Sequence, residues 1–287
     1  MSIRFIFAAF AISLSVAGMA CADETQEQKT APTETLAKNA RIVLAAIIKA
    51  ADENQRLPQR GTPSARGPFR RTGDELTVYY VRIGAAAARR LPGEQAASAY
   101  LLALGIALDD STLLRSNLLT RSLWRSVESN EARKQRLRVL GEPALHGRHD
   151  LAQHFSVSAA LTAVMGAKAA ESAGIVKELL DSRGGSGFSF ADLSADFAGI
   201  AFARRLLAKP SRLADIEKSF RIGDYAISPR GLPEGMMAAD FAKKYGSIKD
   251  ERFQHMQKDI RKRIDALPGY RSPGSKQELN RQDAKKH

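Results

Sequence analysis

One histidine and four carboxylates in the second half of the chain are the residues whose types and spacing could do chemistry. The histidine, His154, lies in an otherwise apolar segment. The carboxylates follow it on two further segments: Glu178, Asp181, Asp192 and Asp196. These five form the candidate catalytic cluster. Carboxylate oxygens with one imidazole suit Mg²⁺, Mn²⁺ or Zn²⁺. The candidate ligands of such a divalent ion are His154, Glu178, Asp192 and Asp196.

The two aspartates at the end of this stretch need a positive partner. Asp192 and Asp196 are four residues apart, and like charges at that spacing destabilise a helix unless a positive group lies near them. His154, a lysine, an arginine or a metal ion could be that group. We expect the cluster to converge from three helices in one polar pocket. If Lys177 or an arginine supplies the charge, the cluster is instead a buried ion network and the enzyme hypothesis loses support.

Several of these residues also have a purely structural interpretation. Asp150 and Gln153 have the spacing of a capping box at a helix start. Ser189 stands three residues before Asp192 in the same way, so a role at a helix start is the alternative interpretation of Asp192. Lys177 and Glu178 could form a surface pair. Two histidines of the preceding loop are further candidate ligands: His146 and His149.

Three predicted helices, 151–166, 169–181 and 190–207, position the cluster. The acidic residues share a helical face with Gly174 on the second helix and with Gly199 on the third. A glycine there lets another backbone come close, at a helix-propensity cost of about 1 kcal/mol. We expect the hairpin of the second and third helices, packed on the first, to form the core. The side chains expected to be buried are Phe155, Leu161, Ile175, Leu179, Leu193 and Phe197.

The order of residues in this stretch resembles a signature of uncharacterised bacterial envelope lipoproteins and, more distantly, the VanZ-like envelope proteins. The matching elements are His154-Phe155, Lys177-Glu178, Asp181, Gly185-Ser186-Gly187-Phe188-Ser189, Asp192-Leu193, Asp196 and Gly199. The VanZ-like pattern begins with Asp-Lys-x-x-His, whereas this chain has Asp150-Leu-Ala-Gln-His154. The resemblance covers residues 147–205 only. It implies an envelope location and no established chemistry.

The rest of the chain predicts an all-α protein, one irregular multi-helix bundle of nine to eleven helices. Apolar residues recur at helical spacing before and after the central stretch. We expect a single helical domain over 34–267, with its core at 147–209 and a C-terminal brace at 210–267. Residues 23–33 and the basic tail 268–287 are expected to be disordered. The helices expected outside the central stretch are 34–54, 76–91, 93–108, a broken one over 112–138, 212–220, 233–245 and 248–267. Trp124 is expected in the core, and the basic run 133–138 on a solvated face.

The first 22 residues read as a secretory signal peptide. Arg4 precedes an apolar run, and Ala20-Cys21-Ala22 fits the small-x-small cleavage rule. Cleavage after Ala22 would leave a chain without cysteine, whereas lipidation at Cys21 would make a lipoprotein. Either route predicts an exported, periplasmic or cell-envelope protein. No later segment is apolar for long enough to predict a transmembrane helix.

The chain is strongly basic, with a formal net charge of +13. For an exported protein the anionic partners are lipid head groups or cell-wall polymers rather than nucleic acid; the charge could also serve solubility alone. Two functions of different class follow. The first is a non-enzymatic structural or binding protein of the envelope, in which the polar cluster is structural. The second is a metal-dependent hydrolase or transferase acting on an envelope substrate. The sequence contains no nucleophile–base pairing that would favour the enzyme.

Overall fold

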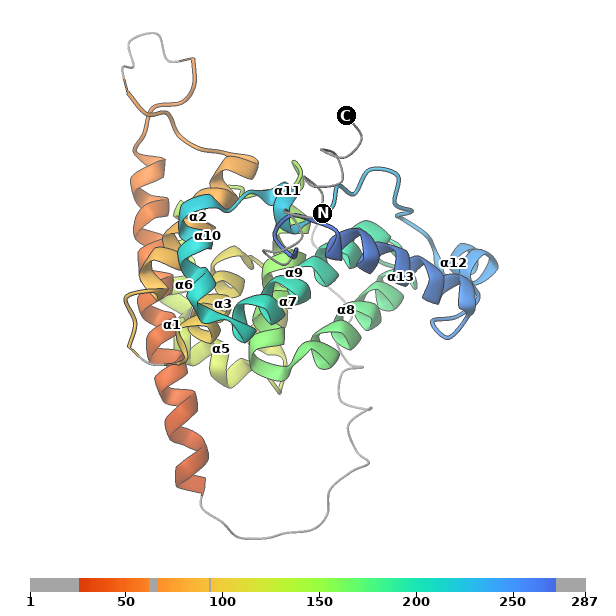
Figure 1. Ribbon diagram of the computed structural model, residues 1–287, viewed down its shortest axis with the longest axis horizontal. Helices are drawn as coiled ribbons and strands as arrows, with labels where there is room; N and C mark the ends of the chain where they lie inside the picture. Colours follow the sequence, from red (N-terminus) through yellow and green to blue (C-terminus); the bar gives the residue numbers. More distant parts are fainter. Residues whose placement is uncertain (1–25, 62–66, 93, 272–287) are drawn as a thin grey trace, which may run out of the picture.

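The computed structural model describes residues 26–61, 67–92 and 94–271, and within them it is all-α (Figure 1). This part of the chain holds thirteen α-helices, one 3₁₀ turn and three isolated β-bridges but no strand. The predicted fold class is therefore confirmed, although the helices outnumber the nine to eleven expected. Two of them, α4 and α11, are single turns of four residues. The predicted signal peptide and most of the predicted basic tail lie outside the described residues.

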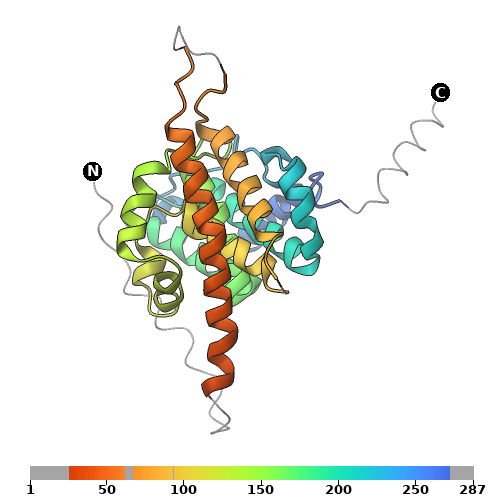
Figure 2. The ribbon, with the colours of Figure 1, turned by 90° about the vertical axis from the view of Figure 1, so that its left-hand side faces the viewer.

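Most of the helices follow one another with short connections, and the longer ones are 56–72 and 226–237. Their bounds are α1 Gln26–Gln55, α2 Gly73–Ala88, α3 Ala96–Leu108, α4 Leu113–Ser116, α5 Arg121–Val127, α6 Asn130–Val139, α7 His149–Met165, α8 Ala167–Asp181, α9 Phe190–Ala208, η1 Pro210–Arg212, α10 Leu213–Ser219, α11 Ile222–Tyr225, α12 Ala238–Tyr245 and α13 Glu251–Asp265. The first helix begins earlier than the predicted 34, and it runs along one side of the bundle (Figure 2). No helix in these ranges has the length and apolar character needed to cross a membrane.

The centre of the bundle is the packing of α7 between α3 and α9. Close approach depends on two glycines. A Cβ on Gly105 of α3 would lie 2.4 Å from the Cβ of Ala160, and one on Gly199 of α9 would lie 2.1 Å from the carbonyl oxygen of Phe155. Real Cβ contacts of that length do not occur, so only glycine allows these helices to approach α7 so closely. The backbone approach predicted at Gly199 is present.

The predicted hairpin exists, but only its second helix belongs to the core. On α8 the buried residues are few, namely Ala170, Gly174 and Glu178, and Ile175 and Leu179 are half-buried rather than buried. Helix α3, rather than α8, packs with α9 against α7 in the core. The apolar residues of α3 are buried on almost every side. A helix that is apolar all round belongs inside a protein, because no face of it is suited to water. The other four side chains expected to be buried are buried: Phe155, Leu161, Leu193 and Phe197.

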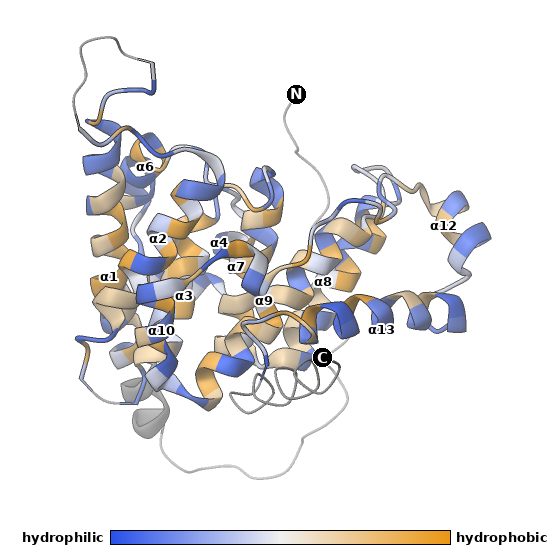
Figure 3. Cartoon of the chain, turned by 45° about the horizontal axis from the view of Figure 1, so that its top comes forward, coloured by the Kyte–Doolittle hydropathy of each residue, from blue (hydrophilic) through white to orange (hydrophobic). Residues whose placement is uncertain are grey.

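The C-terminal helices cover the outside of this centre. Helix α13 packs across α9, and its amphipathic pattern is visible in Figure 3. Its residues Phe253, Ile260 and Ile264 are buried. Phe253 also lies 5.9 Å, ring centre to ring centre, from Phe188 in the connection before α9. The helix thus holds both α9 and the segment that leads into it.

Candidate functional site

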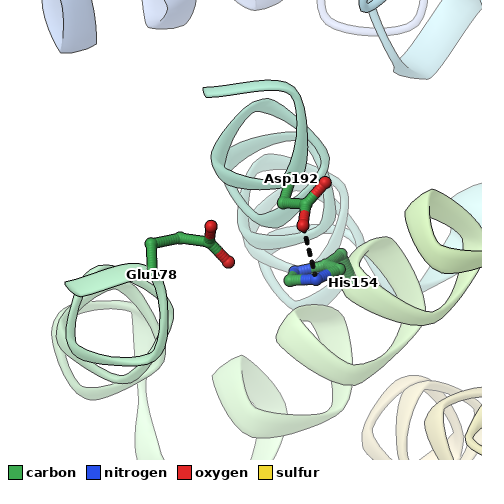
Figure 4. Close-up of side chains that lie close together, drawn as sticks. All are labelled: His154, Glu178 and Asp192. Atoms are coloured by element: carbon green, nitrogen blue, oxygen red, sulfur yellow. Dashed lines mark ion pairs between the residues drawn. The ribbon is translucent and has the colours of Figure 1, made fainter. Parts of the chain in front are cut away.

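Helices α7, α8 and α9 bring the predicted polar residues together (Figure 4). The start of α9 is set by Ser189, whose hydroxyl accepts a hydrogen bond of 3.0 Å from the backbone N–H of Asp192. This places Asp192 in the first turn and Asp196 one turn later, both facing His154 on α7. The cap predicted from the sequence is therefore present. On α7, by contrast, Arg148 is the N-cap residue, and Asp150 lies inside the first turn.

His154 lies between the two aspartates of α9. Its Nδ1 is 3.1 Å from Oδ1 of Asp196, and its Nε2 is 3.4 Å from Oδ2 of Asp192. Ser158 donates a second hydrogen bond, of 2.6 Å, to the same Oδ1 of Asp196. Burial lowers the pKa of His154, but the charge and hydrogen bond of Asp196 outweigh it, so the pKa is raised above that of free imidazole. The imidazolium is thus the positive group that the aspartate pair requires.

Glu178 on α8 is fully buried and is held by two donors. Lys177 donates to its Oε1 and the backbone N–H of Ser189 donates to its Oε2, each at 2.9 Å. Lys177 also donates to Asp181 at 2.9 Å. Burial raises the pKa of Glu178 to about 7, against the lowering effect of the charges on Lys177 and His154. Because Lys177 contacts both carboxylates, it links Asp181 to Glu178.

Arg148 is a member of the network that sequence reasoning missed. Its guanidinium contacts Asp150 at 2.6 Å, Asp192 at 3.1 Å and Glu234 at 2.5 Å. The hydrogen bonds that Arg148 donates to Asp150 and Glu234 raise its pKa above the usual value, although burial lowers it. The spacing of Arg148 and Asp150 is a local signal that could have been read. The contacts with Asp192 and Glu234 have no such signal, because those residues are 44 and 86 positions away.

A pocket of about 150 Å³ lies beside the network. His154, Lys177 and Asp196 contribute to its polar part, and most of its wall is apolar. The apolar side chains are Leu113, Leu114, Val157, Leu161, Met165, Ala169, Ala173 and Val176. Glu178, Asp181 and Asp192 are not among the residues that line it. The five predicted residues therefore do not share one polar pocket. Lys177 contacts Glu178 and Asp181 instead, and Arg148 contacts Asp192.

Three of the predicted ligands could hold a metal ion. His154, Glu178 and Asp192 each offer one ligand atom, and these atoms lie within 4.8 Å of one another. Asp196 contacts Nδ1 of His154, which leaves Nε2 facing Asp192. A carboxylate in that position commonly orients a metal-binding imidazole. Asp196, predicted as a ligand, is thus better placed to position His154.

The two histidines predicted as further ligands lie outside the cluster, one in the loop before α7 and one at the first position of α7. Nε2 of His146 contacts the carbonyl oxygen of Ala226 at 3.0 Å. Nδ1 of His149 contacts the carbonyl oxygen of Pro143, and its Nε2 lies 3.3 Å from Asp110. Both side chains therefore support loops, and neither adds to the group around His154.

A second ion network was missed because Arg136 belongs to the basic run 133–138 that was expected on a solvated face. Arg136 is 1% exposed. It donates to Glu128 at 2.6 Å and to the carbonyl oxygens of Ala107 and Asp109. Arg115 contacts the other oxygen of Glu128 at 3.3 Å. Trp124, in the same region, is buried as expected. This network joins α4, α5 and α6 to the end of α3.

The chain was compared with protein-family models, with curated proteins and with solved structures, and none of the three comparisons finds a match.

Proposed function

We propose that the protein is an exported, envelope-associated binding protein without catalytic activity, whose basic surface meets an anionic envelope component. The observation that supports this most is the charge pairing in the candidate site. Glu178 and Asp181 contact Lys177, Asp192 contacts Arg148, and Asp196 contacts His154. Two of these pairs, Arg148–Asp192 and His154–Asp196, join the start and the middle of α7 to α9. Glu178 also accepts the N–H of Ser189 before α9. Joining helices in this way is a structural role. The signal-like N-terminus and the resemblance to envelope lipoproteins support the location.

Binding to an anionic surface is the first prediction. The purified chain should bind vesicles of phosphatidylcholine mixed with phosphatidylglycerol, or insoluble cell-wall material, and should bind phosphatidylcholine alone far less. Because exposed charges are screened beyond a Debye length of about 10 Å at 0.1 M salt, binding at about 0.05 M salt should be lost at about 0.5 M. Co-sedimentation measures both effects. If neither material binds the chain at low salt, the partner proposal is wrong.

The second candidate function, a metal-dependent hydrolase or transferase, is favoured by an excess of negative charge. Six carboxylates belong to two neighbouring groups of ion pairs, one around Arg148 and His154 and one around Lys177: Asp150, Asp192, Asp196 and Glu234 in the first, Glu178 and Asp181 in the second. They face three cationic side chains: Arg148, His154 and Lys177. A divalent ion held by His154, Glu178 and Asp192 would offset part of this excess, and it would supply activation of water or of a phosphoryl or carbonyl oxygen. Arg148 and Lys177 oppose it, because they already neutralise two of the three ligands.

Metal uptake separates the two candidates. If the enzyme candidate is right, protein purified without chelators should contain about one Zn²⁺, Mn²⁺ or Mg²⁺ per chain by elemental analysis. Asp192→Asn should abolish uptake, and Asp196→Ala should weaken it about 10- to 100-fold as the loss of a group that orients a ligand. Asp110→Ala, which changes an exposed carboxylate outside the cluster, is the control. Wild-type protein that takes up none of these ions would end this candidate.

A further inference from the structure

The connection between α4 and α5 carries an exposed pair of leucines. Leu118 is 67% exposed and Leu119 is 57% exposed. Six large apolar side chains are exposed in the described part of the chain: Ile42, Phe69, Leu118, Leu119, Met165 and Met237. Single exposed apolar residues are common, but an adjacent pair beside further apolar surface marks an interaction site.

The turn that presents these leucines is braced. The side-chain oxygen of Asn117 accepts a hydrogen bond of 2.9 Å from the N–H of Leu119. The hydroxyl of Thr120 donates one of 2.6 Å to the carbonyl oxygen of Leu114. Hydrogen bonds therefore hold both residues that flank the leucine pair, and the leucines lie on a turn of defined conformation.

The leucine pair lies next to the pocket. Asn117 and Thr120, on either side of the pair, both line the pocket, together with Leu114 and Met165. Met165 is itself 37% exposed. An apolar chain that reached the leucine pair would thus find further apolar wall next to it.

The charged residues of the segment that carries the leucines are all basic. Residues 112–127 contain three arginines and no acidic residue. Arg115 is buried against Glu128, whereas Arg121 and Arg125 are exposed one turn apart on α5. A basic side chain near an anionic bilayer is attracted to the negatively charged head groups. Apolar side chains flanked by arginines are the composition of surfaces that lie in the membrane interface.

We propose that Leu118, Leu119, Arg121 and Arg125 form a membrane-contact tip by which the chain binds the surface of an anionic lipid bilayer. The proposal rests on the proposed function and names lipid, rather than cell-wall polymer, as the anionic component. A polymer of charged sugars would need the arginines but would have no use for two exposed leucines. The leucines would enter the acyl-chain boundary while the arginines contact the head groups.

The test is co-sedimentation of the full chain with vesicles of phosphatidylcholine and phosphatidylglycerol. Leu118→Ser/Leu119→Ser should weaken binding at least about tenfold, because two leucine side chains no longer leave water. Arg121→Gln/Arg125→Gln should weaken it about tenfold at low salt and much less at high salt. The control for the leucines is Phe69→Ser/Met237→Ser, which changes two exposed apolar residues away from α5, and the control for the arginines is Arg90→Gln/Arg204→Gln.

A second measurement reports which side chain enters the bilayer. In Leu119→Trp the new indole should shift its emission to shorter wavelength when vesicles are added, whereas Met237→Trp should not shift. If both tip variants bind vesicles like the wild type, the tip is wrong although anionic binding stands. If the chain binds cell-wall material but no vesicles, the lipid assignment is wrong. If it binds neither, the proposed function fails as well.

Discussion

Replacing Gly199 by alanine is expected to destabilise the fold by about 3 kcal/mol, the upper end of what overpacking costs in a close-packed core. The added Cβ would lie 2.1 Å from the carbonyl oxygen of Phe155 and 2.9 Å from its carbonyl carbon. Both are backbone atoms, so no side-chain rotation relieves the contact, and α7 and α9 must move apart. Urea unfolding followed by circular dichroism measures the loss.

The control for this substitution is Gly223→Ala. A Cβ at Gly223 meets nothing within 4 Å, and its backbone is not left-handed. That variant should unfold within about 0.5 kcal/mol of the wild type, as surface substitutions usually do. Because His154 lies on α7 and its aspartate partners lie on α9, Gly199→Ala should also disturb their contacts. An unchanged unfolding midpoint for Gly199→Ala would contradict the close packing described for these helices.

Arg136→Met is expected to cost about 3 kcal/mol, because breaking a buried ion pair leaves the remaining charge with too few partners. Glu128 is fully buried and would keep only Arg115, at 3.3 Å. The carbonyl oxygens of Ala107 and Asp109 would also lose their donor. The free energy of unfolding in urea measures the effect.

Two further variants make this prediction specific. Arg138→Met changes an exposed arginine two residues away and should be nearly neutral. The double variant Arg136→Met/Glu128→Gln should lose less than the sum of the two single variants, because it removes the unpaired charge together with its partner. Strict additivity would mean that the two side chains do not stabilise one another.

The ion pairs of the candidate site connect helices, which agrees with the proposed non-enzymatic role. Arg148 and His154 join α7 to the aspartates of α9, and Glu178 on α8 accepts the backbone N–H of Ser189 at the start of α9. Such buried pairs contribute little net stability against an apolar alternative, but removing one partner is costly. The network therefore ties the register of α7, α8 and α9 together. The pocket beside it is open to a ligand.

The sequence by itself determined the helices and the faces of their polar residues. Apolar periodicity is a local property, and it placed α7, α8, α9 and α13 close to their true bounds. The cap at Ser189 and the close approach at Gly199 were readable for the same reason. The need for a positive charge between Asp192 and Asp196 also followed from their spacing, although four kinds of partner remained open.

Only the tertiary structure decided which positive group lies beside Asp192 and Asp196 and which helices form the core. Arg148 reaches Glu234 across 86 positions of sequence, and no periodicity records such a contact. Helix α8 was expected inside because of its apolar residues, yet α3 has no polar face at all and therefore takes the position against α7. In the sequence Arg136 resembles any other arginine of a basic run. It is buried because it donates hydrogen bonds to Glu128 and to two backbone carbonyl groups at the end of α3. A side chain's partners are set by the packing of distant segments, which a single sequence does not display.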